Sequence, residues 1–277
     1  MPAPALDHQQ VRRGFARATT TYSEYAVLQR EVERRLLEHL DEVPHAPERI
    51  LDIGCGLGNA SLELKKRWPK AQVVAMDSCL AMAQHTRRAA GRWRPRFTVA
   101  CADTRALPFA RQSFDLVFSS LCMPWVEDFS RLVLQWRNVL SPDGYLLCSG
   151  VGPSTLEELG YAFAESDPDA AHIHGFASTQ LIGDTLLAAG FRNPVLLNER
   201  FTLTYPTVRD LLQDLRMTGS TNALQERRRS LTGKSRLSGA IEAYEQFRDA
   251  DGVLPSTCEV IYIQALAHKP RPEPDPA

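Results

Sequence analysis

The sequence lacks long apolar runs and an excess of charge of either sign. No stretch approaches the roughly 18 apolar residues that a membrane-spanning helix needs. The start of the chain also lacks the basic segment and apolar run of a secretory signal. Thirty-two Lys and Arg balance 33 Asp and Glu, so no overall field attracts the chain to nucleic acid or to an anionic membrane. We therefore expect a cytoplasmic protein that binds neither.

Cysteine is also scarce, and it is scattered. The six cysteines of the 277-residue chain include no C-x-x-C pair, which is typical of a reducing compartment and excludes a disulfide or zinc framework. We predict no metal site. Hydrophobic residues make up 44% of the chain, and the length is enough to bury the core of one large domain or two small ones.

Short apolar runs alternate with helical segments through the first half of the chain. The runs cover residues 49–54, 72–77, 96–103, 114–120 and 144–150. Continuous apolar runs are typical of parallel strands that are covered on both faces. Because helical segments separate them, we predict βαβ units and a doubly wound, Rossmann-like α/β fold.

Two helical insertions break this rhythm, at about 151–177 and 206–254, on either side of a strand near 194–205. We expect them to form a cap over the ligand edge of one domain that spans residues 11–268.

Both ends of the chain are expected to lie outside the fold. Residues 1–10 carry no clear pattern, and four prolines interrupt 269–277. The first predicted helix begins near Thr21, because Thr21 and Glu24 form a capping-box pattern ahead of apolar residues at helical spacing.

A glycine-rich loop follows the first predicted strand in LDIGCGLGN. Gly54, Gly56 and Gly58 have no side chains, so backbone N–H groups can approach a ligand there. A dinucleotide loop reads G-x-G-x-x-G, but here the third glycine comes one residue early and Asp52 sits in the loop. An unpaired carboxylate would repel pyrophosphate but suit S-adenosylmethionine, a phosphate-free cation. A plain βα turn and a nicotinamide-type loop are the alternatives.

Two more acids end the next two strands. Asp77 is placed to accept hydrogen bonds from both ribose hydroxyls, and Asp103 from an adenine amino group. The apolar contact with the ring is expected from Met76, Met82, Leu107 or Leu121. Singly, Asp77 could cap a helix and Asp103 could belong to a turn. Three acids at three strand ends favour a nucleoside site.

The segments LDIGCGLG, VVAMD, ACADTRALPF and SFDLVFSS resemble those of class I S-adenosylmethionine-dependent methyltransferases. Over about residues 12–267 the chain is similar to the malonyl-acyl-carrier-protein O-methyltransferases of biotin synthesis. This likeness is carried by FARATTTY, GPSTLEEL, HIHGF, ERFTLTYP, DLLQDLRMTGSTN and RRRSLTGKSRL.

The resemblance implies a seven-stranded sheet with its last strand antiparallel and a helical lid. It also implies that S-adenosylmethionine methylates the free carboxylate of malonyl-acyl carrier protein or malonyl-CoA and leaves S-adenosylhomocysteine. The predicted cofactor-binding residues are Arg17, Asp52, Gly54, Gly56, Gly58, Asp77, Met82, Asp103, Thr104 and Ser119.

The expected transfer needs no general base, because a carboxylate is already ionised at pH 7 and a sulfonium methyl is already electrophilic. Orienting residues are therefore predicted: Tyr22 over the methyl donor, Arg17 on its carboxylate, and Arg200 gripping the substrate carboxylate. Each could instead be structural or solvated. His172 is expected to donate a hydrogen bond in the pocket, and His174 to lie at the surface. The predicted walls of the acyl pocket are Trp125, Phe176 and Tyr205.

A basic cluster stands out in this near-neutral chain. It consists of Arg227, Arg228, Arg229, Lys234 and Arg236. Such runs are usually solvated faces, but this one could dock an acidic acyl carrier protein.

Some family positions differ in this chain, among them Ser120, Pro124 and the pair His174–Gly175. They lie where substrate would be contacted, so another small acceptor remains an alternative. A non-catalytic cofactor-binding protein and a nicotinamide oxidoreductase are further alternatives. The oligomeric state is left open.

Overall fold

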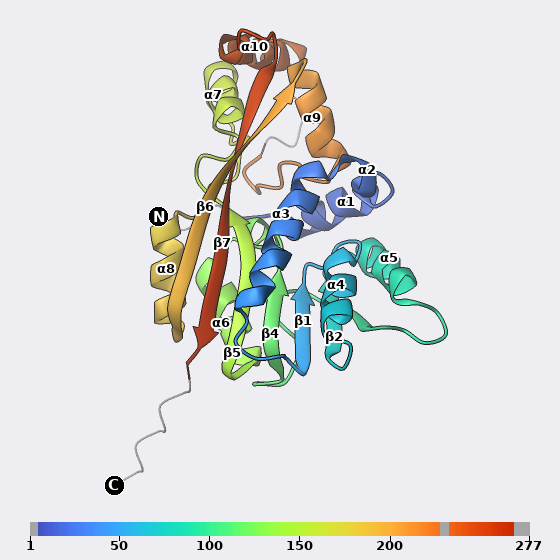
Figure 1. Cartoon of the computed structure of the whole chain (residues 1–277). Coiled ribbons are helices and arrows are strands. Elements are labelled where there is room, and N and C mark those ends of the chain that lie inside the picture. Colours follow the sequence, from blue (N-terminus) through green and yellow to red (C-terminus); the bar gives the residue numbers. More distant parts are fainter. Residues whose placement is uncertain (1–4, 228–232, 269–277) are drawn as a thin grey trace.

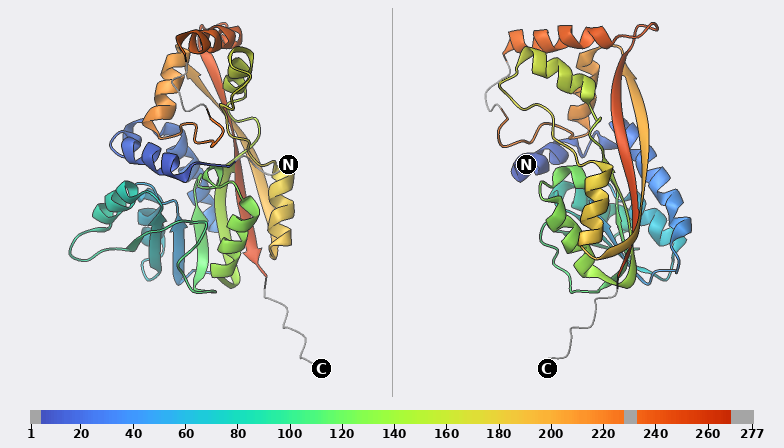
Figure 2. Two further views of the ribbon diagram at one scale, coloured as in Figure 1. Left: turned by 180° about the vertical axis from the view of Figure 1, so that it is seen from behind. Right: turned by 90° about the vertical axis from the view of Figure 1, so that its left-hand side faces the viewer.

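The computed structural model describes residues 5–227 and 233–268. A seven-stranded sheet runs through it in the order β3-β2-β1-β4-β5-β7-β6 (Figures 1 and 2). Strands β1 to β5 pair in parallel, and β7 is antiparallel to β5 and β6. The predicted doubly wound fold with an antiparallel last strand is confirmed. The strands are β1 (Arg49–Ile53), β2 (Gln72–Asp77), β3 (Thr98–Cys101), β4 (Phe114–Ser119), β5 (Leu140–Val151), β6 (Phe191–Tyr205) and β7 (Leu254–Ala267).

Helices cover both faces of the sheet because its central strands are apolar on both sides. Ile53 packs with Trp136 on the face covered by α6 and α8, whereas Ile50 packs with Leu36 on the face covered by α3 and α4. The helices of these layers are α3 (Val27–Glu38), α4 (Asn59–Arg67), α5 (Leu80–Ala90), α6 (Phe129–Val139) and α8 (Thr179–Ala188), with short 3-10 turns η1 (His39–Glu42) and η2 (Met123–Trp125). Within the described residues, no helix has the length and apolar character to cross a membrane.

A lid stands above one end of the sheet. It consists of α7 (Glu157–Ser166), α9 (Val208–Met217), α10 (Lys234–Tyr244), η3 (Glu245–Phe247) and their loops. Strands β6 and β7 extend past the other strands and carry these helices (Figure 1). The lid has its own core, in which Leu159, Val208 and Leu211 pack around the fully buried Tyr244. Its helices lie within the two segments where insertions were expected.

The first residues belong to the fold, contrary to prediction. Helix α1 (His8–Ala18) begins after Asp7, whose carboxylate caps its first turn. Leu6 is buried and forms a β-bridge with Leu224 beside the lid. Long-range pairing, which leaves no local pattern in a short segment, holds residues 5–10 in place.

The predicted capping box at Thr21 is also wrong. The Thr21 hydroxyl donates to the backbone oxygen of Met217, 2.8 Å away at the end of α9, instead of capping the next turn. The short helix α2 (Tyr22–Tyr25) follows without a side-chain cap, and α3 starts separately after Ala26. Contact with the lid therefore replaces the local signal.

Candidate functional site

A cavity of about 700 Å³ lies between the sheet and the lid. Its cofactor half is lined by the glycine loop and the ends of β2 and β3, including Gly56 and Asp77. Its lid half is lined by the upper part of β6 and the lid helices, including Leu159 and Leu203. Helices α1 and α2 cover the junction with Phe15 and Tyr22. The fold therefore joins a nucleoside-type loop and the insertions in one chamber.

The glycine loop is tightly built. Gly54 and Gly56 line the cavity, and the backbone N–H of Gly54 donates to the Met76 oxygen over 2.8 Å. Gly58 begins α4 with a φ of +88°, and a Cβ there would lie 2.8 Å from the Thr86 methyl. Only glycine fits this position without strain, so Gly58 shapes the loop from beneath while the other two face the ligand space.

Asp77 sits at the floor of the cofactor half. Its two carboxylate oxygens accept backbone N–H groups from Gly56 (3.0 Å) and Cys79 (2.7 Å). Burial raises its pKa to about 6, although these two hydrogen bonds oppose the shift. Each oxygen accepts one of these hydrogen bonds and has a further lone pair, so Asp77 can accept from ribose hydroxyls, a role that stays a prediction.

Asp52 does not line the cavity, which corrects its predicted position in the loop. Strand β1 continues through Ile53, and because strand side chains alternate, Ile53 faces the cavity while Asp52 points beneath α4. There it is 1% exposed and accepts a hydrogen bond from the Ser61 hydroxyl. Burial raises its pKa to about 7. The acidity of the cofactor half therefore comes from Asp77.

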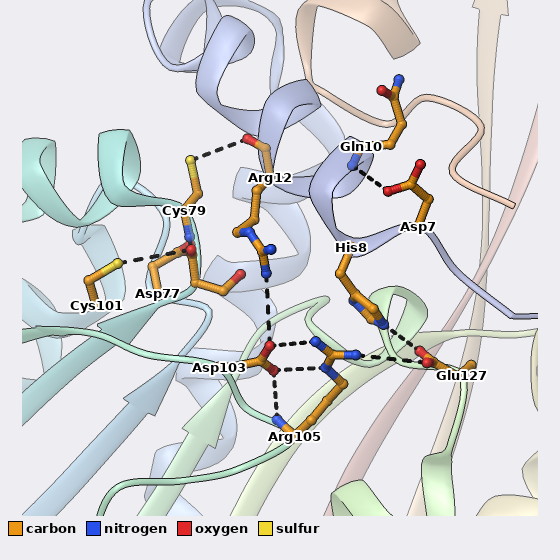
Figure 3. Close-up of polar contacts among 11 residues, drawn as sticks. Asp7, His8, Gln10, Arg12, Asp77, Cys79, Cys101, Asp103, Arg105 and Glu127 are labelled. Atoms are coloured by element: carbon orange, nitrogen blue, oxygen red, sulfur yellow. Dashed lines mark hydrogen bonds and ion pairs between the residues drawn. The ribbon is translucent and has the colours of Figure 1, made fainter. Parts of the chain in front are cut away.

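Asp103 is likewise outside the cavity, although Thr104 next to it is part of the lining. Its oxygens accept from the Arg105 guanidinium at 3.0 and 2.7 Å, and Arg12 of α1 lies 3.9 Å away (Figure 3). Hydrogen bonding by Arg105 lowers the pKa of Asp103 to about 2. The carboxylate thus ties α1 to the loop after β3 instead of meeting an adenine.

The other residues predicted to bind the cofactor differ in their positions relative to the cavity. Met82 and Thr104 line the cavity. Ser119 is fully buried and donates to the Ile53 oxygen over 2.9 Å, which fixes the strand beneath the loop. Arg17 is exposed on α1 and does not reach the cavity, so no contact supports its pairing with the methionine carboxylate.

Aromatic side chains lie where the two halves meet, and Tyr22, Trp125 and Phe176 all line the cavity. The Trp125 ring meets Phe15 edge-on at 5.1 Å. Burial raises the pKa of Tyr22 well above its usual value. Its hydroxyl therefore keeps its proton and can donate a hydrogen bond at neutral pH. The sequence does not predict the Phe15–Trp125 contact, because Phe15 has the same spacing as any apolar residue of an amphipathic helix.

The two histidines of HIHGF both line the cavity. His172 stacks on Phe163 with ring centres 4.0 Å apart, and its Nε2 lies 3.1 Å from an Asp167 oxygen. His174 was expected at the surface, but its Nε2 accepts the Ala223 backbone N–H over 3.2 Å. Burial lowers its pKa, so its ring is neutral at pH 7.

Arg200 lies outside the cavity, which corrects its predicted grip on the substrate. Its side chain is 60% exposed, pairs with Glu157 and donates to the Thr257 hydroxyl over 3.1 Å. The predicted alternation of β6 is present, but it turns Leu203 and Tyr205 toward the cavity and Arg200 away. The pattern identified two faces without showing which one the lid would enclose.

Two arginines of the basic cluster form ion pairs within the protein, which the sequence did not indicate. Arg227 forms an ion pair with Asp7 at 2.9 Å, and Arg236 with Asp167 at 3.3 Å. Lys234 is exposed at the start of α10. Arg228 and Arg229 lie outside the described residues. Carrier-protein docking by this cluster stays a prediction, with two of its charges already paired.

Several lining residues were not predicted. They include Val11, Gln29, Ser78, Cys122, Arg216, Thr221 and Asn222. Leu121 has a φ of +53°, and its N–H donates to the Ser149 hydroxyl over 3.1 Å, which turns the chain after β4 into the cavity. Such a left-handed leucine leaves no mark in a sequence.

Known proteins match the chain both in its cofactor-binding part and over nearly its whole length. A family model described as a methyltransferase domain matches residues 50–144, the cofactor half. The malonyl-[acyl-carrier protein] O-methyltransferase of Xylella fastidiosa (strain M23) is 48% identical over 270 residues, which cover 97% of this chain and 90% of that protein. The chain belongs to this family of O-methyltransferases. A second member, from Halorhodospira halophila, is 43% identical over 95% of the chain.

The fold of this malonyl-[acyl-carrier protein] O-methyltransferase family member also resembles solved structures. The YcgJ protein of Bacillus subtilis covers 86% of the chain with a TM-score of 0.60 and 17% identity, and the chain covers all of that protein. The sequence-based prediction of an S-adenosylmethionine-dependent methyltransferase is thus confirmed.

Proposed function

We propose that this methyltransferase esterifies the free carboxylate of a malonyl group carried by acyl carrier protein. The observation that carries the proposal is the single cavity, which opens from Asp77 and the glycine loop directly into the enclosed lid half. The relatives' names supply the substrate, and the cavity supplies the means to hold it beside the cofactor.

The reaction cancels two opposite charges. A carboxylate oxygen of the malonyl group attacks the methyl carbon, the carbon–sulfur bond breaks, and its electron pair stays on sulfur. A cationic sulfonium and an anion become a neutral thioether and a neutral methyl ester, and no proton moves. Charge cancellation is favoured by an apolar, water-free site, because water stabilises the two separated charges more than the transition state.

The lid half has the polarity that this reaction needs. Apart from Arg216, no lysine or arginine within the described residues contributes to the lining of the cavity. The groups nearest the junction are uncharged at pH 7, since burial lowers the pKa of His174 and raises those of Tyr22 and Cys122, the last to about 12. The sulfonium is then the main positive partner for the substrate carboxylate.

The remaining roles follow from position. Gly54 and Gly56 leave room for the cofactor, and Asp77 accepts from its ribose. Tyr22 and its neighbours on α1 and α2 exclude water and offer a hydroxyl donor. Holding the reacting atoms in line is worth roughly 7 to 11 kcal/mol, so positioning can carry most of the acceleration.

The test is methyl transfer from labelled S-adenosylmethionine to malonyl-acyl carrier protein. Mass spectrometry should show the gain of one methyl group, which mild base removes. Acetyl-acyl carrier protein, which lacks the free carboxylate, is the matched control and should gain nothing. Transfer to both proteins, or to neither, would contradict the proposal. Malonyl-CoA in a parallel reaction decides whether the carrier protein itself is required.

A further inference from the structure

One cation stands at the mouth of the cavity. Arg216 lies in the last turn of α9, whose lower end rests beside α1 and α2 (Figure 1). It is the only Lys or Arg that lines the cavity within residues 5–227 and 233–268. It is also the only lining residue that is exposed, whereas every other one is buried or half-buried. Arg216 therefore marks the rim, where the cavity meets solvent.

Arg216 has no partner of its own in the described part of the chain. Among the described residues, no hydrogen bond or ion pair links its guanidinium to another side chain. The neighbouring acid of α9, Asp214, accepts instead from the Tyr205 hydroxyl over 2.7 Å inside the lid half. An unpaired arginine at the rim of a substrate cavity is suited to an anion, because its planar fork matches carboxylate and phosphate oxygens.

The reacting carboxylate is a poor candidate for this anion. A guanidinium on it would stabilise the charged ground state and lose that contact as the ester forms, which would slow the transfer. The carboxylate must also reach the cofactor half, whereas Arg216 lies at the exposed rim. The other anion of a carrier-bound malonyl group is the phosphodiester that joins the pantetheine arm to the protein.

We infer that Arg216 binds the phosphodiester of the phosphopantetheine arm while the malonyl end passes into the lid half. This inference rests on the proposed function and names the residue that recognises the carrier form of the substrate. The arm itself carries amides and methylenes, and the neutral lining between the rim and the junction, such as Leu212, Leu215 and Asn222, fits such a chain. CoA carries the same phosphate position, so the inference covers it too.

Three malonyl thioesters can show whether Arg216 binds the phosphate or the carboxylate. Malonyl-acyl carrier protein and malonyl-CoA carry both anions, whereas malonyl-pantetheine lacks the phosphate. Arg216→Gln should raise KM about tenfold for the first two and leave kcat within about twofold, as expected for a lost charge-assisted contact outside the reacting centre. KM for malonyl-pantetheine should not change. Arg209→Gln is the matched control, because Arg209 is exposed on the same side of α9 but does not line the cavity.

Equal effects of Arg216→Gln on all three thioesters would assign the arginine to the carboxylate and overturn the inference. The inference would also be overturned if Arg216→Gln left KM for malonyl-acyl carrier protein unchanged, or if Arg209→Gln raised it equally. Binding of free 4′-phosphopantetheine, measured by calorimetry, gives an answer that does not depend on turnover: the wild type should bind it about tenfold more tightly than Arg216→Gln. Failure of the proposed function would show separately, as absence of wild-type methylation of malonyl-acyl carrier protein.

Discussion

The two halves of the cavity differ in how they are built. The cofactor half comes from consecutive strand ends, with backbone N–H groups and one half-buried carboxylate, Asp77, held within hydrogen-bond distance of Gly56. The lid half is assembled from segments far apart in sequence, and its walls are aliphatic and aromatic with few charges. Asp77 offers a negatively charged acceptor in the cofactor half, whereas the lid half is mainly apolar, with Asp214 and Arg216 among its few charged residues. This difference is what a charge-cancelling transfer requires.

The largest expected effect concerns the polar half. Asp77→Asn should weaken S-adenosylmethionine binding about 10- to 100-fold, because it removes the cavity's charged acceptor for the ribose. Asp103→Asn is the matched control, since Asp103 also ends a strand region but pairs with Arg105 outside the cavity. It should change affinity by less than about threefold. Calorimetric titration with the cofactor measures both, and equal losses would contradict the division described above.

The neutral half can be tested by adding a charge. Leu203→Lys should lower kcat about tenfold, because a cation near the substrate carboxylate stabilises the charged ground state. Leu203→Met, of similar length and uncharged, should stay within about twofold of the wild type. Steady-state rates with malonyl-acyl carrier protein give the comparison, and cofactor affinity shows whether the other half is intact. A kcat unchanged by the lysine would remove the argument for a neutral chamber.

A smaller effect is expected where the halves meet. Gly219, after α9, has a φ of +75°, and a Cβ there would lie 3.1 Å from the backbone of Gly14 in α1. Gly219→Ala should therefore cost about 1 to 3 kcal/mol of stability. It should also weaken cofactor binding by displacing α1. Gly233→Ala, with open space around the position, should be neutral in thermal unfolding and in titration. Similar melting points for the two variants would show that the junction is loose.

The smallest effect lies beneath the cofactor half, away from the cavity. Burial raises the pKa of Glu33 to about 8 and that of Asp52 to about 7, each helped by a neighbouring carboxylate. The folded state then binds more protons than the unfolded chain between pH 4 and 8, so the free energy of unfolding should fall as pH rises through this window. We expect the melting temperature to drop by several degrees from pH 6 to 8.

Glu33→Gln should flatten this pH dependence, whereas Glu24→Gln, at an exposed position of α2, should leave it unchanged. Melting curves at half-unit steps of pH measure the slope. A wild-type stability that rises with pH would show that both carboxylates are ionised in the folded protein.

The contrast between the halves also explains what the sequence could predict. The fold, the glycine loop and Asp77 follow from local patterns, because a strand, a turn and a helix in succession fix the geometry of a βα unit. The prediction that Asp103 meets the adenine is wrong for a local reason. Arg105, two residues later, donates hydrogen bonds to the Asp103 carboxylate, and the strand pattern does not show this pairing.

The lid half was harder to predict because long-range contacts determine it. The sequence shows the alternation of β6, but the side that the lid encloses depends on where α7 and α9 pack, so the alternation alone does not show that Arg200 faces away from the cavity. The burial of His174 has no local signal, because its ring forms hydrogen bonds with the backbones of Ala223 and Pro124, which lie 49 and 50 residues away. No sequence pattern singles out Arg216 as a cavity residue, because α9 carries several other polar residues on its outer side.

A structure of the ternary complex with S-adenosylhomocysteine and malonyl-pantetheine tests the account most directly. We expect the ribose on Asp77, the sulfur at the junction beside Tyr22, and the malonyl carboxylate next to the sulfur among neutral groups only. A carboxylate held by an arginine or lysine, or a thioester bound outside the cavity, would contradict it.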